Sequence, residues 1–135
     1  MSSPSGSRRE ARERALSLLY EAELKDQAPA DLLAELAVDP DPFAVDLVSG
    51  VGEHQAELDE VIARYAIDWA LDRMPVVDRN VLRLGVFELL HRPEIPVGAV
   101  ISEAVELAKR YSTEDSGRFV NGVLAGVAAQ REATG

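Results

Sequence analysis

Apolar residues recur every three or four positions along most of the chain, which is the spacing of one face of an α-helix. The stripes predict helices near residues 8–22, 30–37, 43–65, 77–90, 97–111 and 114–128. The third range is either one long helix or two helices with a bend near Gly50–His54. No convincing period-two alternation, the mark of a half-buried β-strand, is visible. The pattern therefore predicts an all-α fold, a compact single-domain bundle of six or seven helices.

Helix boundaries are marked by capping residues and prolines. Ser7 and Glu10 have the spacing of a capping box, and Pro42 and Pro96 suit the first turn of a helix. A length of 135 residues fits one domain. We expect a disordered tail over residues 1–6, one helical domain over 7–131, and a short C-terminal tail over 132–135.

The composition argues against several classes of function. The chain has no cysteine, which excludes disulfides, thiolate metal ligands and cysteine nucleophiles. His54 and His91 are its two histidines; we expect His54 to be exposed and His91 to complement the C-terminal end of a helix dipole. Catalytic and phosphate-loop motifs are missing from the sequence. We expect no enzymatic activity, no metal and no cofactor.

No apolar run approaches the roughly 18 residues that a membrane-spanning helix needs. The N-terminus is polar rather than a signal peptide. These two observations lead us to expect a soluble, cytoplasmic protein without membrane association.

Charge is segregated along the chain, whose formal net charge is −10. Residues 21–60 hold 12 acidic side chains and one lysine, whereas residues 1–20 have an excess of arginine. On a helix, Arg8 and Arg12 share a face and Arg9 lies beside them, so their guanidinium groups could bind phosphates. Arginines at the start of a helix are equally compatible with simple solvation.

Aromatic residues are scarce, and two of them are candidates for a single-stranded RNA site, because unstacked bases stack on planar side chains. Tyr20 follows Arg12 by a little over two helical turns, and Phe119 lies near the start of the last helix. Each ring is either a stacking platform for a base or part of the core.

Five segments of the chain form a distinctive set of motifs. The longest is S-T-E-D-S-G-R-F-V-N-G-V-L at Ser112–Leu124, preceded by S-E-A-V-E-L-A-K at Ser102–Lys109. The others are R-R-E-A-R-E-R-A-L-S-L-L-Y at Arg8–Tyr20, V-D-R-N-V-L-R-L-G-V-F-E-L-L at Val77–Leu90 and E-I-P-V-G-A-V-I-S-E-A at Glu94–Ala104. Together these segments resemble the NusB family of transcription antitermination factors. The resemblance covers about residues 7–130 and is weakest across Lys25–Pro42.

The resemblance implies a non-catalytic helical protein that binds boxA RNA together with the ribosomal protein NusE. Such a complex helps RNA polymerase to read through terminators, notably in ribosomal RNA operons. The residues that the resemblance places at the RNA are Arg8, Arg9, Arg12, Tyr20, Asp115 and Phe119. It places Asp78 at the partner surface, and it allows a homodimer.

Asp115 has a second interpretation, because a carboxylate repels phosphate. Either Ser112 or Thr113 is expected to cap the last helix. Ser112 and Asp115 are spaced as a capping box, so Asp115 either accepts hydrogen bonds from base edges or takes part in that cap. Gly117 departs from the family pattern, in which a larger residue is expected.

Three alternatives to an RNA-binding antitermination factor remain at this point. The first is a helical adaptor whose acidic block binds a basic protein while the arginines do nothing. The second is the NusB-like module of a ribosomal RNA methyltransferase, which the length of the chain disfavours. The third is an enzyme, which would need a pocket of converging polar groups.

Overall fold

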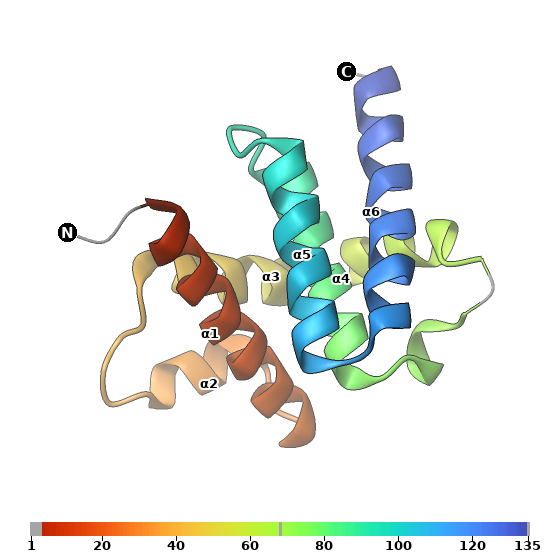
Figure 1. Cartoon of the computed structure of the whole chain (residues 1–135). Coiled ribbons are helices and arrows are strands. Elements are labelled where there is room, and N and C mark those ends of the chain that lie inside the picture. The colour runs from red at the N-terminus through yellow and green to blue at the C-terminus, as the bar shows by residue number, and fades with distance from the viewer. Residues whose placement is uncertain (1–3, 68, 135) are drawn as a thin grey trace. The chain divides into compact units, whose positions relative to one another are not determined.

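The computed structural model of the chain describes residues 4–67 and 69–134, with side chains described for residues 8–67 and 69–131. This part of the chain forms six α-helices and one short 3-10 helix, and it has no β-strand (Figure 1). The elements are α1 (Pro4–Leu24), α2 (Pro29–Glu35), α3 (Pro42–Tyr65), η1 (Leu71–Arg73), α4 (Val76–His91), α5 (Val97–Tyr111) and α6 (Glu114–Thr134). The predicted all-α fold is confirmed.

Proline fixes several helix boundaries. Pro29 and Pro42 are the first residues of α2 and α3, a position where the missing N–H of proline costs nothing. Before α3, Asp41 Oδ1 accepts a hydrogen bond from the Phe43 backbone N–H at 2.8 Å and caps the helix. The range 42–65 is one continuous helix rather than two.

Both ends of the chain are more helical than the sequence pattern predicted. α1 begins at Pro4, before the predicted helix start near residue 8, and residues 1–3 lie outside the described part. Proline is well tolerated in the first turn of a helix. α6 continues to Thr134 through good helix formers, beyond the predicted helix end near residue 128.

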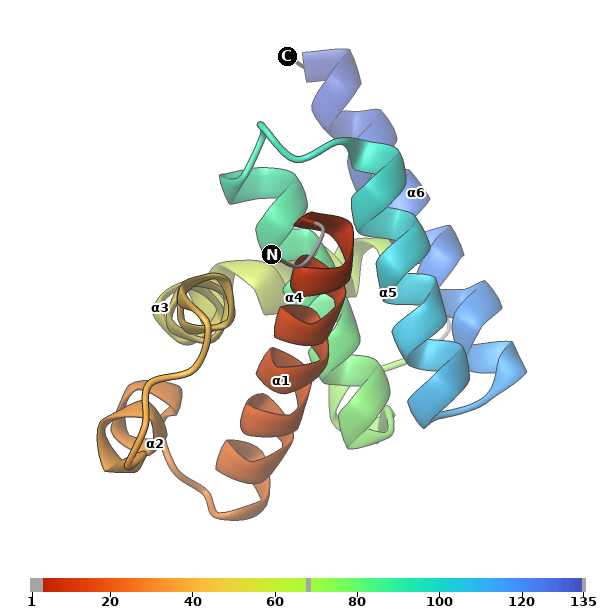
Figure 2. The same ribbon diagram turned by 60° about the vertical axis from the view of Figure 1, so that its left-hand side comes forward.

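The chain divides into two compact units, residues 1–53 and 54–135. In the first unit α1 packs against α2. In the second unit α4, α5 and α6 pack against one another (Figures 1 and 2). α3 contributes its first half to one unit and its second half to the other.

α4 is the central helix of the second unit, and its residues 80–89 are all buried. A Cβ atom on Gly85 would lie 2.7 Å from Leu124 Cδ1, so the missing side chain allows α4 and α6 to approach closely. The buried Arg83 meets Asp59 of α3 with two hydrogen bonds, Nε to Oδ1 at 2.7 Å and Nη2 to Oδ2 at 3.0 Å. This bidentate pair fixes the second half of α3 against α4.

The helices of the described residues include none with the length and apolarity needed to cross a membrane.

Candidate nucleic-acid interface

The basic arm of α1, which consists of Arg8, Arg9 and Arg12, is only partly accessible. Arg8 and Arg9 are exposed, whereas Arg12 is buried with 5% of its surface accessible. Arg8 and Arg12 share a helix face, as the sequence predicted, and that face meets Phe43. The guanidinium carbons of Arg8 and Arg12 lie 5.3 Å and 5.4 Å from the centroid of the Phe43 ring. Two cations therefore share one half-buried aromatic ring, a favourable cation–π arrangement.

Phe43 was not among the sequence candidates. It begins the apolar stripe of α3, where a ring is expected to be ordinary core. Because its partners come from a helix about thirty residues earlier, no local spacing pairs it with the arginines. Its role follows only from the fold.

Tyr20 is an exposed aromatic residue, with 40% of its surface accessible. At 3.6 residues per turn, the eleven positions from Arg9 to Tyr20 make just over three whole turns of α1. Arg9 and Tyr20 therefore lie in line on one face of the helix, about 16 Å apart along its axis. The sequence analysis compared Tyr20 with Arg12, but the buried Arg12 leaves Arg9 as the exposed cation in that line.

At the start of α6, Thr113 is the capping residue. Its Oγ1 accepts a hydrogen bond from the Ser116 backbone N–H at 2.9 Å, so the predicted pairing of Ser112 with Asp115 is not the cap. Asp115 is exposed and forms an ion pair with Arg118 on the next turn. Arg118, which is also exposed, was not among the sequence candidates; it places a cation beside the Asp115 carboxylate.

Phe119 is half-buried and packs edge-on against Trp69, with ring centroids 5.0 Å apart and an interplanar angle of 70°. This is a favoured aromatic geometry, so part of the ring is committed to packing. Phe119 is still partly exposed, and it directly follows Arg118 on α6.

Asp78 lies in the interior, with none of its surface accessible. Its Oδ2 accepts a hydrogen bond from Ser116 Oγ at 2.6 Å, which joins the first turn of α4 to the first turn of α6. Asp78 Oδ1 has no hydrogen-bond partner among the described residues. As folded, this carboxylate contacts its own chain, so direct contact with a partner would require local opening.

The two sets of candidates belong to different units. Arg8, Arg9, Arg12 and Tyr20 lie in residues 1–53, and Asp78, Asp115 and Phe119 in residues 54–135. Within its own unit each set makes the contacts described above.

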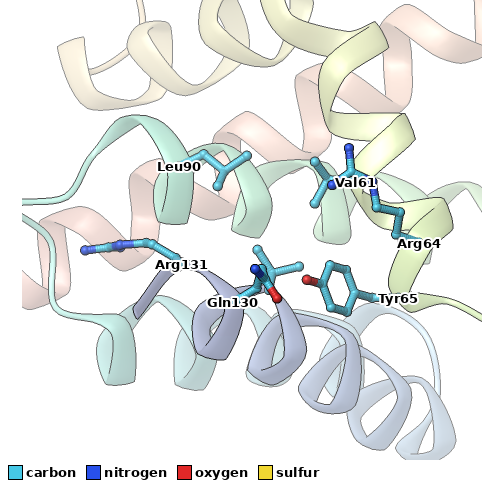
Figure 3. A pocket seen from close by; sticks show the side chains of 7 residues that line it. Val61, Arg64, Tyr65, Leu90, Gln130 and Arg131 are labelled. Carbon is cyan, nitrogen blue, oxygen red and sulfur yellow. The ribbon is translucent and has the colours of Figure 1, made fainter. Parts of the chain in front are cut away.

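A cavity of about 190 Å³ lies in the second unit, where the last turns of α3, α4 and α6 meet (Figure 3). The residues around it are Val61, Arg64, Tyr65, Leu90, Val127, Gln130 and Arg131. Its volume is below the roughly 300–1,000 Å³ of typical small-molecule sites. Arg131, on its rim, donates a hydrogen bond to the Leu89 carbonyl oxygen at 2.8 Å, a structural role at the end of α4.

Taken together, the fold and these side chains define an all-α protein that exposes arginines and a few rings on its helices. A family model for the NusB family matches residues 9–129, and the chain belongs to that family. The resemblance seen in the sequence is thereby confirmed.

Comparison with individual proteins agrees with this assignment. The chain is 52% identical over 128 residues to the transcription antitermination protein NusB of Salinispora arenicola, covering 90% of this chain and 94% of that protein. Its fold matches that of T. maritima NusB with a TM-score of 0.83 and 38% identity, covering 96% and 93% of the two chains. It also matches a chain in a crystal structure of antitermination factors NusB and NusE with dsRNA, with a TM-score of 0.79 and 33% identity over 92% and 97% of the chains.

Proposed function

We propose that this protein is a transcription antitermination factor that binds boxA RNA together with NusE. In this role it supports read-through of terminators by RNA polymerase in ribosomal RNA operons. The observation that carries the proposal is the likeness, over 92% of the chain, to a protein solved in a complex of NusB and NusE with dsRNA. The role requires binding rather than bond-making chemistry, so we propose no catalytic activity and, since nascent RNA is its ligand, a cytoplasmic location.

On α1, Arg8 and Arg9 are the groups proposed to contact phosphates, because both are exposed. Guanidinium groups bind phosphate oxygens through paired hydrogen bonds and set affinity rather than sequence preference. The position of Tyr20 in line with Arg9 suits a strand that runs along the helix and stacks one base on the ring.

Arg12 has a different part in the proposal, because its burial limits what it can offer to RNA. Arg12 and Arg8 lie over the same ring, so Phe43 and Arg12 together restrict where the Arg8 side chain can lie. We therefore assign Arg12 to positioning the arm, with direct phosphate contact left to its exposed neighbours.

On α6, we propose that Arg118 and Asp115 act as a pair. The ion pair lowers the repulsion between the Asp115 carboxylate and RNA phosphates, which would make an acidic residue compatible with the RNA surface. The exposed part of Phe119, one residue further on, would add a stacking edge for a base.

For NusE, we propose that Asp78 acts through α6 rather than by direct contact. Its hydrogen bond with Ser116 holds the first turn of α6 in place, and Asp115 and Arg118 lie on that turn and the next. Loss of the Asp78 carboxylate would then weaken partner or RNA binding by loosening this turn.

A titration of boxA RNA at fixed salt, with and without NusE, tests the proposal. We expect tighter binding with NusE, because a chain of net charge −10 on its own opposes the approach of a polyanion. An RNA of the same length with a scrambled boxA sequence is the control. Light scattering of the free protein separates a monomer from the homodimer that the family resemblance allows.

Two outcomes would contradict the proposal. Equal RNA affinities with and without NusE would remove the joint recognition. If the protein binds NusE but does not bind RNA either with or without NusE, the alternative of a helical adaptor for a basic protein would be favoured.

A further inference from the structure

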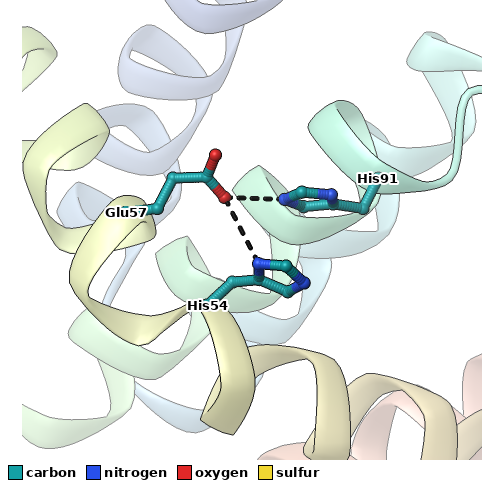
Figure 4. Close-up of side chains that lie close together, drawn as sticks. All are labelled: His54, Glu57 and His91. Atoms are coloured by element: carbon teal, nitrogen blue, oxygen red, sulfur yellow. Dashed lines mark hydrogen bonds and ion pairs between the residues drawn. The ribbon is translucent and has the colours of Figure 1, made fainter.

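Both histidines of the sequence meet at one point of the second unit, together with a glutamate (Figure 4). His54 and Glu57 lie one turn apart on α3, and His91 is the last residue of α4. His91 Nε2 lies 2.7 Å from Glu57 Oε1, and His54 Nδ1 lies 3.6 Å from the same oxygen. In sequence the two histidines lie 37 positions apart, and no metal was expected. The fold brings their ring nitrogens to one carboxylate.

From this cluster we propose that His54, Glu57 and His91 bind a divalent transition-metal ion of the zinc class. The three ligand atoms all lie within 4.8 Å of one another. In a tetrahedral site with Zn–N bonds of about 2.0–2.1 Å, ligand atoms are about 3.3 Å apart. Closing the cluster around an ion therefore needs movements of about an ångström in side chains that are exposed or half-exposed.

The donor set determines the class of ion. Two imidazole nitrogens and one carboxylate oxygen suit Zn²⁺, Cu²⁺, Ni²⁺ and Co²⁺, whereas Mg²⁺ and Ca²⁺ prefer oxygen ligands alone. Three protein ligands leave the remaining coordination position to water. The proposal concerns binding of the ion, which would hold α3 and α4 together.

The electrostatic surroundings favour a cation. His91 ends α4, where the helix dipole places partial negative charge. Arg92 is a nearby cation that would repel a bound metal ion. Its guanidinium carbon lies 4.9 Å from the centroid of the Phe87 ring. Arg92 Nη1 also donates a hydrogen bond to the His91 carbonyl oxygen at 2.6 Å, which directs that cation toward the backbone.

The rings need one rearrangement to accept the ion. His54 and His91 are stacked, with centroids 4.1 Å apart and an interplanar angle of 22°, and the Phe87 ring lies beside both. A metal ion lies in the plane of each imidazole that binds it, so the two rings must fan apart. The His54 side chain is 37% accessible, which leaves it able to turn away from the stack.

Zn²⁺ titration of the tag-free, chelator-treated full chain tests the site by calorimetry and by the rise of Tm. We expect one ion to bind per chain and Tm to be higher with Zn²⁺ than with the same concentration of Mg²⁺. The affinity for Zn²⁺ should fall as the pH is lowered, because protons compete with the ion for the imidazole nitrogens. His54→Gln, Glu57→Gln and His91→Gln should each weaken Zn²⁺ binding at least about tenfold. Glu60→Gln is the matched control, since Glu60 lies one turn after Glu57 and pairs with Arg64.

Three results would overturn the inference. They are Zn²⁺ binding unchanged in His54→Gln, an equal Tm rise with Mg²⁺, and no measurable binding by the wild-type chain. His54→Gln is the decisive variant because His54 is only partly buried, and a retained helical circular-dichroism spectrum verifies its fold. Shifts of both histidine ring ¹⁵N signals with Zn²⁺ would show directly that the imidazoles are ligands.

Discussion

Ser116 Oγ donates a hydrogen bond to Asp78 Oδ2 at 2.6 Å, although 38 residues separate the two in sequence. Ser116 Oγ also lies 2.9 Å from Thr113 Oγ1 and 3.0 Å from Ser112 Oγ. A buried carboxylate is thereby connected to the hydroxyl groups that begin α6. The arrangement ties the N-terminal turns of α4 and α6, the two helices that carry Asp78 and Asp115.

Ser116→Ala should lower the free energy of unfolding by about 1–3 kcal/mol, because the buried Asp78 carboxyl group would lose its hydrogen-bond donor. Urea unfolding measures the change. The double variant Ser116→Ala with Asp78→Ala should recover part of the loss, since removing both partners leaves no buried polar group without its hydrogen-bond partner. Ser17→Ala, at an exposed position of α1, is the control and should change stability by a few tenths of a kcal/mol. Equal effects of the two serine substitutions would refute the assigned role.

Gly85→Ala should destabilise the second unit. The added Cβ would lie 2.7 Å from Leu124 Cδ1, and Leu124 is fully buried, so its side chain has little room to move. Such overpacking costs about 1–3 kcal/mol, against about 1 kcal/mol gained from helix propensity. Gly122→Ala is the matched control on α6, because beyond the neighbouring residues and backbone of its own helix no described heavy atom would lie within 4 Å of an added Cβ. Thermal unfolding should therefore give opposite signs for the two substitutions, and the same sign would contradict the packing argument.

Arg8→Gln with Arg9→Gln should weaken RNA binding and reduce its dependence on salt. Each phosphate contact to a single strand contributes about 0.7 to the slope of log K against log[salt], so the loss of two contacts should reduce its magnitude by about 1.4. Titrations at several salt concentrations measure the slope. Arg14→Gln removes an exposed arginine from another face of α1 and should leave the slope unchanged. A slope unaltered in the double variant would remove these arginines from the RNA surface.

Tyr20→Ala should reduce RNA affinity by about 1–3 kcal/mol if the ring stacks one base, whereas Tyr20→Phe should be nearly neutral because stacking does not need the hydroxyl. Tyr111→Ala serves as the comparison, since Tyr111 is a similarly exposed tyrosine on α5. Filter binding at one salt concentration gives all three values. A loss in Tyr20→Phe as large as in Tyr20→Ala would point to hydrogen bonding instead of stacking.

Much of the fold was predictable because helix signals are local. The apolar stripe from Val97 to Ala108 and the prolines at 42 and 96 placed α3 and α5 within a residue or two at their starts. The apolar pattern did not mark Pro4 and Thr134 as the outer helix ends, because polar helix formers carry no apolar periodicity. The division into two units depends on which helices pack together, and the apolar stripe of one helix does not indicate which other helix it packs against.

The site was predictable in its residue types and less so in their environment. The spacing of Arg8 and Arg12 correctly placed them on one face, but it carried no information that the face meets Phe43 and buries Arg12. Asp78 is polar and near a helix start, which in a sequence is typical of an exposed position. Its partner Ser116 lies on another helix, so only the packing of α4 on α6 explains its burial.

Because two guanidinium groups contact Phe43, the choice of positions to substitute in this protein should not follow charge alone. A neutral residue of α3 sets where positive charge is presented on α1, so hydrophobic substitutions at position 43 should alter electrostatic behaviour without changing net charge. A survey confined to lysines and arginines would overlook this determinant. Phe43 thus belongs in any scan of polyanion affinity.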